Sequence, residues 1–337
     1  MRSILIVRLG ALGDILHTIP VAAALRTRFP NARIDWVVDE RHRAILDLVP
    51  VVNRRLVFRT LSASLPARIV EIRRNLVSER YDIAVDVQGL LKSAVVAKFS
   101  GASRVIGFTT PHLRESAAGI FYTDRQDPAA ALHVIRKNLT LAGALGADVS
   151  VIRFPLRIPS SPVADVIRAR VAHHRGFAVL NPGAAWASKR WLPERFGAVA
   201  QWLRRVCDLA SVVTWGPGDE MAAAAVVASA AGSAELAPPT GVADLAAVIR
   251  EASLTVSGDT GPAHLAAAVG TPLVGLFGPT DPVRNGPWSK DDLTVSRFAE
   301  CRCHHRRRCS AAQWCLEDIS VNDVTETITQ RLEERTP

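Results

Sequence analysis

The stretch Ser257-Gly258-Asp259-Thr260-Gly261-Pro262-Ala263-His264 carries the residue types of a phosphate-binding turn. An apolar run at 254–256 precedes it and predicts a buried strand, and an alanine-rich run at 265–269 predicts a helix with Pro262 in its first turn. Such a turn points amide N–H groups and the positive end of the helix dipole at one spot, which favours a phosphate. The same pattern also fits an ordinary turn in which Asp259 caps the helix.

Two further turns carry charged residues that suit a nucleotide. Lys189 lies between Gly183 and a helix expected from 193, so its ammonium group can reach a diphosphate or remain a solvated surface group. Glu220 starts a helix after the turn at Gly216, where it can accept hydrogen bonds from both ribose hydroxyls or simply complement the helix dipole. Together with Thr260, Gly261 and His264, these residues predict a nucleotide site.

Asp14 is the candidate general base of the first half of the chain. It follows Gly13 at a strand-to-helix turn, where the helix dipole is expected to stabilise the carboxylate and lower its basicity. A helix-capping role is the structural alternative. Gly10 and Gly13 lack the third glycine of a dinucleotide fingerprint, but Asp39 and Glu40 lie near the expected ribose carboxylate, which leaves a nicotinamide-dependent oxidoreductase as an alternative.

Four of the five cysteines, Cys301, Cys303, Cys309 and Cys315, cluster near the C-terminus among arginines and histidines. Their spacing is not that of a standard zinc site, so we expect reduced thiols packed beside a basic surface loop, with a bound zinc or iron as the alternative. The adjacent arginines suit phosphorylated lipid or anionic headgroups, or remain a solvated charge run. The pattern does not resemble a secreted disulfide framework.

The elements that must position these residues alternate between strand and helix. In the first half, strands are expected at 4–7, 34–38, 56–58, 83–87 and 105–108, and helices at 15–28, 43–48, 67–79, 90–97 and 130–145. In the second half, strands are expected at 178–180, 211–215, 254–256 and 273–277, and helices at 193–205, 221–231, 242–251 and 318–334.

This alternation predicts an α/β protein with two Rossmann-like, doubly wound parallel sheets. The proline-spaced stretch from 154 to 162 predicts a linker, which gives domains at 1–155 and 156–337. The terminal helix at 318–334 is given a possible place against the N-terminal domain. Ligands of such sheets bind at the carboxyl ends of the strands, so a cleft between the two halves is the expected site.

Composition narrows the class of partner. The chain has 337 residues and a net charge of +9, which favours an anionic partner. The basic residues are scattered and aromatic residues are few, so a phosphorylated or lipid-borne substrate is favoured over nucleic acid. The short apolar N-terminus predicts no signal peptide, and we expect a cytoplasmic protein that rests at the membrane through its charge.

Four segments in order resemble the heptosyltransferases of glycosyltransferase family 9, which build the inner core of lipopolysaccharide. They are Arg8 to Pro20 (RLGALGDILHTIP), Asp86 to Ser93 (DVQGLLKS), and Gly258 to His264 (GDTGPAH) with Phe277 to Pro282 (FGPTDP). The resemblance extends from Met1 to about Trp288. It implies a GT-B fold, an acceptor on the N-terminal domain, and ADP-heptose on the C-terminal domain.

The implied reaction is an inverting transfer of heptose, without a metal or other cofactor, to a Kdo or heptose hydroxyl of Kdo-lipid A or its heptosylated form. By this resemblance Asp14 matches the catalytic base, Lys189, Thr260 and Gly261 match diphosphate contacts, and His264 lies just beyond them. Glu220 matches the ribose carboxylate and Asp259 the residue beside the donor sugar.

On the acceptor side, Lys92, Arg114 and His133 match residues of the family. Arg59 to Ser64 is less basic than the acceptor loop of heptosyltransferase I, so the acceptor is expected to differ. Related members also carry a cysteine-rich stretch in the tail. A nucleotide- or lipid-binding module without catalysis is the remaining alternative.

Overall fold

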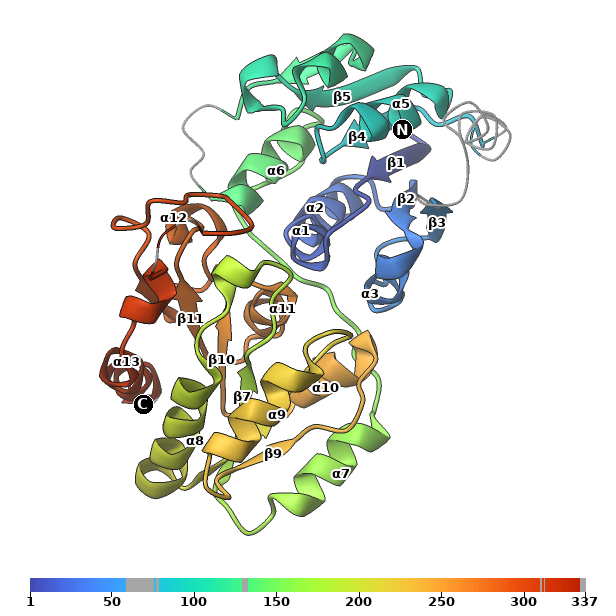
Figure 1. Ribbon diagram of the computed structural model, residues 1–337. Coiled ribbons are helices and arrows are strands. Elements are labelled where there is room, and N and C mark those ends of the chain that lie inside the picture. Colours follow the sequence, from blue (N-terminus) through green and yellow to red (C-terminus); the bar gives the residue numbers. More distant parts are fainter. Residues whose placement is uncertain (59–75, 77–78, 129–132, 310, 312, 334–337) are drawn as a thin grey trace. The chain divides into compact units, whose positions relative to one another are not determined.

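The computed structural model describes residues 1–58, 76, 79–128, 133–309, 311 and 313–333. The chain forms two compact units, Met1–Arg157 and Ile158–Pro337, which divide two residues after the boundary expected from the sequence. Each unit has its own parallel sheet flanked by helices (Figure 1). The α/β class with two doubly wound sheets is therefore confirmed. The segment Arg59 to Ser64 and most of the helix expected at 67–79 lie outside the described residues.

The sheet of the first unit has the strand order β3-β2-β1-β4-β5-β6 among the described residues, with every pairing parallel. Its strands are β1 (Ser3–Val7), β2 (Arg33–Asp39), β3 (Arg54–Phe58), β4 (Ile83–Asp86), β5 (Arg104–Phe108) and β6 (Asp124–Gln126). The chain reverses its direction of travel across the sheet between β1 and β4. This order puts the turns that follow β1 and β4 at the switch point, where ligands of doubly wound sheets bind.

The helices of this unit are α1 (Leu12–Leu16), α2 (Ile19–Arg28), α3 (Arg43–Asp47), α5 (Leu91–Phe99) and α6 (Val134–Gly143), with short 3-10 turns at Glu40–His42, Thr110–His112 and Ser116–Phe121. The single helix expected at 15–28 is wrong, since the chain breaks at His17 and Thr18. Pro20 explains the break because it lacks an amide proton and sits in the first turn of α2.

The second unit repeats the same topology. Its sheet order is β12-β11-β10-β7-β8-β9, again with parallel pairings only. The strands are β7 (Gly176–Asn181), β8 (Leu209–Val213), β9 (Ala234–Leu236), β10 (Leu254–Gly258), β11 (Leu273–Phe277) and β12 (Leu293–Ser296). The switch point here lies between β7 and β10, so the turns after these two strands form the expected ligand edge.

The helices of the second unit are α7 (Pro162–Arg170), α8 (Pro193–Cys207), α9 (Glu220–Ser229), α10 (Val242–Glu251), α11 (Gly261–Val269), α12 (Pro282–Asn285) and α13 (Val321–Glu333). The expected linker is shorter than predicted because Ser161 caps α7, which begins at Pro162. The terminal helix α13 belongs to the second unit, where Val324 and Ile328 are buried in the core with β10, β11 and α8. That this helix also packs on the N-terminal domain stays a prediction.

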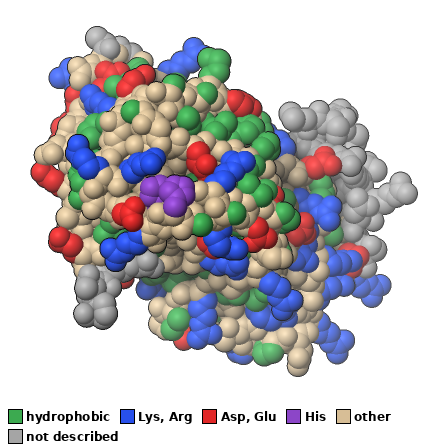
Figure 2. All heavy atoms as spheres, turned by 90° about the horizontal axis from the view of Figure 1, so that it is seen from below, with side chains coloured by type: hydrophobic (Ala, Val, Ile, Leu, Met, Phe, Trp, Pro, Cys, Tyr) green, Lys and Arg blue, Asp and Glu red, His purple; other side chains and the backbone are tan. Residues whose placement is uncertain are grey.

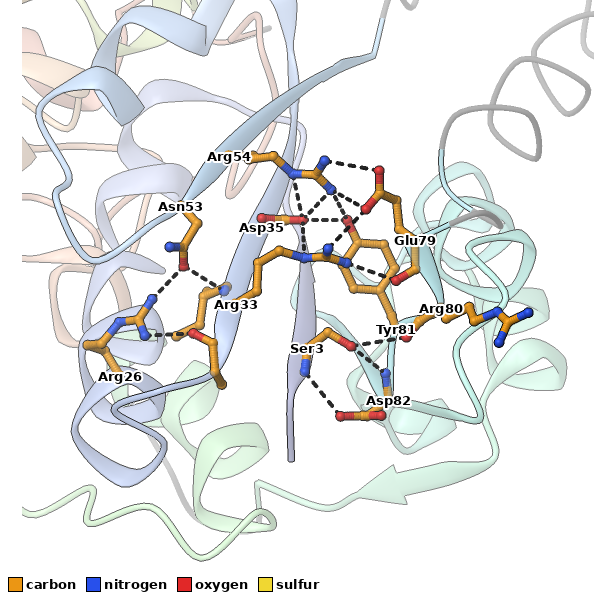
Figure 3. Close-up of polar contacts among 12 residues, drawn as sticks. Ser3, Arg26, Arg33, Asp35, Asn53, Arg54, Glu79, Arg80, Tyr81 and Asp82 are labelled. Atoms are coloured by element: carbon orange, nitrogen blue, oxygen red, sulfur yellow. Dashed lines mark hydrogen bonds and ion pairs between the residues drawn. The ribbon is translucent and has the colours of Figure 1, made fainter.

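A buried polar cluster holds the strands of the first unit together toward the amino end of β2 (Figure 3). The Asp35 carboxylate accepts hydrogen bonds from Tyr81 at 2.6 Å and from Arg54 at 2.8 Å, and its side chain is fully buried. Arg33 and Arg54 each also pair with Glu79. Burial and the hydrogen bond to Asp35 raise the pKa of Tyr81, so the phenol stays protonated and donates.

No helix of the described residues is long and apolar enough to cross a membrane.

Candidate active site

Lys189, Asp259 and His264 form one polar cluster at the switch point of the second sheet. The ammonium of Lys189 lies 2.5 Å from Asp259 Oδ2, and the His264 ring nitrogen Nε2 lies 3.1 Å from Asp259 Oδ1. Lys189 comes from the turn after β7, Asp259 directly follows β10, and His264 lies in the first turn of α11. Three residues that are 70 and 5 positions apart along the chain are therefore in direct contact.

The electrostatics of this cluster keep Asp259 ionised. Its side chain is 4 % exposed, and burial alone would raise its pKa. The hydrogen bond and charge of His264 and the charge of Lys189 outweigh that effect and hold the pKa of Asp259 far below its ordinary value. Both carboxylate oxygens are occupied, so Asp259 serves to position the Lys189 ammonium and the His264 ring and is unsuited to accept a proton.

The N-terminus of α11 opens beside this cluster. Pro262 has no amide proton, which leaves the amides of Gly261 and Ala263 as the donors of the first turn. Thr260 is the N-cap residue, but its hydroxyl contacts Ser257 at 3.0 Å and Asn181 at 3.3 Å and makes no capping bond. Asp259 does not cap the helix either, since its carboxylate contacts Lys189 and His264. The amides at this helix start are suited to an anion.

Local packing fixes the position of Lys189. Its ammonium also donates to the Asp259 carbonyl at 3.2 Å and lies 4.7 Å from the centre of the Trp186 ring. The strand end approaches this turn closely, because a Cβ added at Gly258 would lie 3.0 Å from the Lys189 carbonyl oxygen. Glycine at position 258 is therefore what lets the two turns meet.

Glu220 occupies the next turn along the sheet and makes a local contact. Its carboxylate accepts a hydrogen bond from the Gly218 amide at 2.8 Å, and the side chain is exposed. The neighbouring Asp219, which sequence reasoning missed, pairs with Arg190 at 3.1 Å. A Cβ at Gly183 would lie 2.2 Å from Asp219 Oδ2, so Asp219 packs directly on the turn after β7. Asp219 and Arg190 thus join the turns after β7 and β8.

In the first unit, Asp14 is held by an arginine. Arg8 Nη2 lies 2.6 Å from Asp14 Oδ1, and Arg8 Nη1 donates to the Val87 carbonyl at 2.9 Å. Asp14 Oδ2 also accepts from the Ala11 amide at 3.2 Å. The Asp14 side chain keeps 25 % of its surface exposed, whereas that of Arg8 keeps 7 %. A nearly buried arginine therefore clamps a carboxylate that stays accessible to a substrate.

Arg8 is the main functional candidate that sequence reasoning missed. The available signal was its place directly after the apolar run at 4–7, where a strand end delivers a side chain to the ligand edge of the sheet. Burial alone would raise the pKa of Asp14, but the charges of Arg8 and Arg114 and the hydrogen bonds from Arg8 and Ala11 lower it below its ordinary value. The expected cause, a helix dipole, is wrong because α1 has only 5 residues and Arg8 supplies the stabilising charge.

A second layer of hydrogen bonds holds the two turns of this switch point together. Gln88 accepts from the Leu9 amide at 2.7 Å, which joins the turns after β1 and β4. The fully buried Asp86 accepts from Ser93 at 2.9 Å, from Tyr122 at 2.8 Å and from the Gln88 amide at 2.9 Å. Burial nevertheless raises the pKa of Asp86. This network fixes the carbonyl of Val87, to which Arg8 is bonded.

The three acceptor-side candidates occupy different places in the first unit. Arg114 is exposed, and its charge acts on Asp14. His133 caps α6 by accepting from the Ile135 amide at 3.2 Å, and its ring meets that of His17 edge to face at 6.1 Å. Lys92 is exposed in the first turn of α5. Of the three residues, Arg114 therefore acts electrostatically on Asp14. Lys92 lies in α5, and His133 caps α6. The helix expected at 130–145 is described from Val134.

Asp39 and Glu40 are the residues on which the oxidoreductase alternative depends, and Asp39 is already bonded to a neighbouring arginine. Asp39 is nearly buried and accepts from the Arg41 guanidinium at 2.8 Å and from the Arg41 amide at 3.1 Å. Burial would raise the pKa of Asp39, but these hydrogen bonds lower it. Glu40 is exposed.

The C-terminal cysteines converge as a thiol cluster. Cys301, Cys303 and Cys315 are buried together with Cys309 packed against them, and Cys301 Sγ lies 3.7 Å from Cys303 Sγ. Burial and the neighbouring thiols raise the pKa of Cys303 and of Cys315 to about 12, so both stay protonated at neutral pH. All five cysteines are free, and the described residues contain no group of histidine, cysteine or carboxylate side chains arranged to hold a metal ion.

A comparison with protein-family models identifies the family of this chain. The sequence model of "Glycosyltransferase family 9 (heptosyltransferase)" matches residues 69–315. The curated lipopolysaccharide heptosyltransferase 1 of Salmonella typhimurium is 29 % identical over 303 residues, which covers 86 % of this chain and 92 % of that protein.

Solved structures of one relative match almost the whole chain. E. coli heptosyltransferase WaaC with ADP is 25 % identical with a TM-score of 0.78, covering 98 % of this chain and 99 % of that one. WaaC with ADP-2-deoxy-2-fluoro heptose is 24 % identical with a TM-score of 0.76, covering 97 % and 99 % respectively. The fold is therefore the GT-B fold of these proteins.

Proposed function

The chain belongs to glycosyltransferase family 9, the heptosyltransferases, and we propose that it transfers heptose from ADP-heptose to a Kdo or heptose hydroxyl of the lipopolysaccharide inner core. The coarser statement, a heptosyltransferase of the lipopolysaccharide core, follows from its family and from relatives that cover most of its length. The observation that carries the proposal is the contact of Lys189 with Asp259 and His264 at the start of α11.

The donor assignment rests on the chemistry of the second switch point. A diphosphate needs cations and N–H donors, and Lys189 together with the Gly261 and Ala263 amides provides both. The relative WaaC has been solved with ADP and with a fluorinated ADP-heptose, which supports the same class of donor here. Glu220, one turn along the sheet, is proposed to accept hydrogen bonds from the ribose hydroxyls.

The proposed reaction is a single displacement. The acceptor oxygen forms a bond to the anomeric carbon, the bond from that carbon to the diphosphate oxygen breaks, and its electron pair leaves with ADP. Asp14 takes the proton of the attacking hydroxyl. One displacement inverts the anomeric configuration.

The leaving group is proposed to be stabilised by protein groups alone. Negative charge develops on the diphosphate oxygen as the bond breaks, and Lys189 with the start of α11 lies where it can stabilise that charge. Asp259 keeps Lys189 and His264 in place before the donor arrives. These groups give a physical basis for transfer that needs no metal ion.

The low pKa of Asp14 is compatible with a base that acts late. A carboxylate with a pKa below its ordinary value is a weak base toward a free hydroxyl. The hydroxyl becomes much more acidic once its oxygen has begun to bond to the anomeric carbon. Asp14 then accepts the proton while remaining fully ionised, and therefore ready, at neutral pH.

The acceptor is proposed to be an anionic, lipid-anchored sugar. Kdo carries a carboxylate, and Arg114 places a positive charge near Asp14, where such a group would lie beside the reacting hydroxyl. His133 and Lys92 are proposed as further contacts with the acceptor. The net charge of +9 suits a protein at the cytoplasmic face of the inner membrane, where such an acceptor would be met.

An acceptor panel tests the proposal. The purified protein is incubated with ADP-heptose and with either Kdo-lipid A or its heptosylated form, and ADP release is followed together with the mass of the product. Release of ADP with one acceptor, and an inverted anomeric configuration in the product, are expected. Undiminished turnover in a chelating buffer supports a metal-independent reaction. ADP binding without transfer to either acceptor would contradict the proposed reaction.

A further inference from the structure

The segment 301–309 is a basic loop fixed to the second unit by its thiols. Cys301 and Cys303 are buried with Cys315, so the two cysteines at the start of the loop act as apolar anchors. A Cβ at Gly278 would lie 2.8 Å from Cys315 Sγ, which places this thiol cluster directly against the turn after β11. The loop is therefore packed onto the body of the unit by its buried side chains.

Backbone hydrogen bonds fix the loop as well. The His305 amide donates to the Pro279 carbonyl at 2.8 Å, and the Ser188 hydroxyl donates to the Arg306 carbonyl at 2.9 Å. The His304 ring stacks on Phe298 with centroids 4.3 Å apart and an interplanar angle of 23°. These contacts tie the backbone of the basic loop to the turns after β7, β11 and β12, while its charged side chains are left to the surface.

Four arginines of the loop, Arg302, Arg306, Arg307 and Arg308, are exposed and have no ion pair with a described residue. Glu300, the only carboxylate in the segment 300–309, is also exposed. The loop therefore presents several positive charges that no ion pair with a described residue neutralises.

Several arginines elsewhere in the described structure form ion pairs with carboxylates. Arg104 contacts Asp124 at 2.6 Å, Arg168 contacts Glu251 at 2.9 Å, and Arg297 contacts Asp323 at 2.7 Å. Over much of the face shown in Figure 2, basic and acidic side chains likewise lie next to one another. Like charges held close together repel, so a fixed loop without carboxylates is unfavourable until an anionic surface approaches it.

The basic loop lies at the carboxyl ends of the second sheet, on the same edge as the nucleotide turns. Ser188, which bonds to it, directly precedes Lys189. Burial, Arg284 and His304 lower the pKa of the His305 ring, and the charge of Lys189 adds a smaller effect in the same direction. A surface that contacts the loop is thereby brought to the edge of the sheet where the donor is proposed to bind.

We propose that the basic loop docks this unit onto an anionic phospholipid surface. The proposal deepens the proposed function and rests on it for one point, that the acceptor is lipid-anchored. A lipid surface is favoured over the donor as the occupant because four arginine side chains are exposed to solvent. One diphosphate requires fewer guanidinium groups than that. Phospholipid phosphates present many such charges in one plane, and several arginines contact them together.

Vesicle binding by matched variants tests this docking. The loop variant is Arg306→Gln/Arg307→Gln/Arg308→Gln, and the control is Arg170→Gln/Arg175→Gln/Arg205→Gln, which removes three exposed arginines from elsewhere in the same unit. Binding is measured by sedimentation with vesicles of phosphatidylethanolamine and phosphatidylglycerol and with vesicles of phosphatidylcholine alone. The loop variant should bind the anionic vesicles on the order of a hundredfold more weakly than the unaltered protein, and the control only a few-fold more weakly.

Each outcome bears on the proposal. Binding that falls with added salt and depends on phosphatidylglycerol supports it. If the two variants lost equal vesicle affinity, the effect would come from the net charge of the protein, and the assignment to this loop would be overturned. Lack of vesicle binding by the unaltered protein would also overturn it.

Turnover with an acceptor freed of its acyl chains separates the docking from the proposed function. This turnover should be unchanged in the loop variant. A raised KM for ADP-heptose in that assay would assign the arginines to the donor instead. Vesicle binding is measured without substrate, so it stands or falls independently of whether the unaltered protein transfers heptose.

Discussion

Asp14 and Asp259 are two aspartates at comparable turns, each at the switch point of a doubly wound sheet, but their surroundings differ. Asp259 has a cation or ring on each oxygen and 4 % of its side chain exposed. Asp14 has one arginine and one backbone amide, and 25 % of its side chain is exposed. In both cases positive neighbours outweigh burial and lower the pKa of the carboxyl.

The difference in exposure assigns the two aspartates different tasks. A carboxylate whose oxygens are both saturated and buried positions its partners, as Asp259 does for Lys189 and His264. A carboxylate that is clamped on one side and open on the other can meet a substrate hydroxyl. The same chemical group therefore positions its neighbours in the second unit, the proposed donor half, and is the candidate base in the first unit, the proposed acceptor half.

Asp35 shows that an aspartate among cations is not by itself a site. It is fully buried, it contacts Arg33, Arg54 and Tyr81, and it lies toward the amino end of β2 (Figure 3). Ligands of doubly wound sheets bind at the opposite, carboxyl edge. Position on the sheet, rather than the composition of the cluster, separates the structural carboxylate of Asp35 from the proposed catalytic carboxylate of Asp14.

The largest expected effect comes from removing the carboxylate of Asp14. The Asp14→Asn variant keeps the size of the side chain but cannot accept the proton, so turnover with ADP-heptose should fall by about 10² to 10⁴. ADP affinity, measured by calorimetry, should stay within about twofold because the donor cluster is untouched. The control Asp47→Asn alters an exposed carboxylate of the same unit and should be fully active. Near-normal turnover of Asp14→Asn would contradict the role of Asp14 as the base, and with it the difference in function between Asp14 and Asp259.

The next largest effect is expected on the donor side, at Lys189. The Lys189→Met variant removes the charge that faces the diphosphate, and the rate of transfer should fall by roughly 10² to 10³. ADP affinity should fall in parallel, unlike in the Asp14 variant. Lys290→Met, which removes an exposed lysine of the same unit, is the control. If Lys189→Met bound ADP normally and lost only turnover, its place in the diphosphate site would be wrong.

A third experiment sharpens the comparison through pH. Arg8→Met removes the cation that lowers the pKa of Asp14, so that pKa should rise by roughly 1 to 3 units. Since the base must be ionised, the acid limb of kcat/KM, which falls as pH drops through the pKa of Asp14, should move to higher pH by that amount. Turnover at neutral pH should also drop about tenfold because the carboxylate loses its clamp.

The stability of the Arg8 variant should change in the matching direction. A depressed folded-state pKa contributes stability above the unfolded value, near 3.8, which is lost as pH falls through the folded pKa. Without Arg8 this contribution should disappear. Arg8→Lys keeps the charge but cannot reach both Asp14 and the Val87 carbonyl. The acid limb of kcat/KM should therefore return close to its original pH, whereas turnover at neutral pH should recover only in part. An unshifted acid limb in Arg8→Met would mean that Asp14 does not set it.

The central strands were predictable because their residues are buried on both faces. The runs at 4–7, 83–87, 254–256 and 273–277 are mostly apolar and correspond to β1, β4, β10 and β11. The edge strands β6, β9 and β12 were missed. They are 3 or 4 residues long, and charged or polar residues interrupt them, as edges require.

The site was predictable only where residue type and turn coincide. The glycine turns pointed to Asp14 and to Asp259 with its neighbours. The contact of Asp259 with Lys189 depends on sheet order, which brings distant turns together, whereas the contact of Asp14 with Arg8 forms within one turn. Arg8 was missed because an arginine after a strand is common, and only the bond to the Val87 carbonyl makes it a clamp. Asp219 and Arg190 were missed for the same reason, since their pairing spans two turns.

The smallest expected effect tests how far the donor half extends beyond its buried cluster. Glu220 is exposed, and its carboxylate bonds to the Gly218 amide of its own turn, so it is already oriented before the donor binds. Glu220→Gln keeps one acceptor oxygen and loses the charge. Its KM for ADP-heptose should rise about fivefold with kcat nearly unchanged, the loss of about one ordinary hydrogen bond.

Glu317→Gln, an altered glutamate elsewhere in the second unit, is the control for Glu220→Gln. The discriminating measurement compares ADP with 2′-deoxy-ADP as competitive inhibitors. If Glu220 accepts from the ribose, the unaltered protein should prefer ADP and the variant should lose much of that preference. A preference that survives in Glu220→Gln would place the ribose elsewhere and confine the donor site to the turns after β7 and β10. Asp259 would then remain the centre of the donor half, with Glu220 reduced to stabilising its own turn.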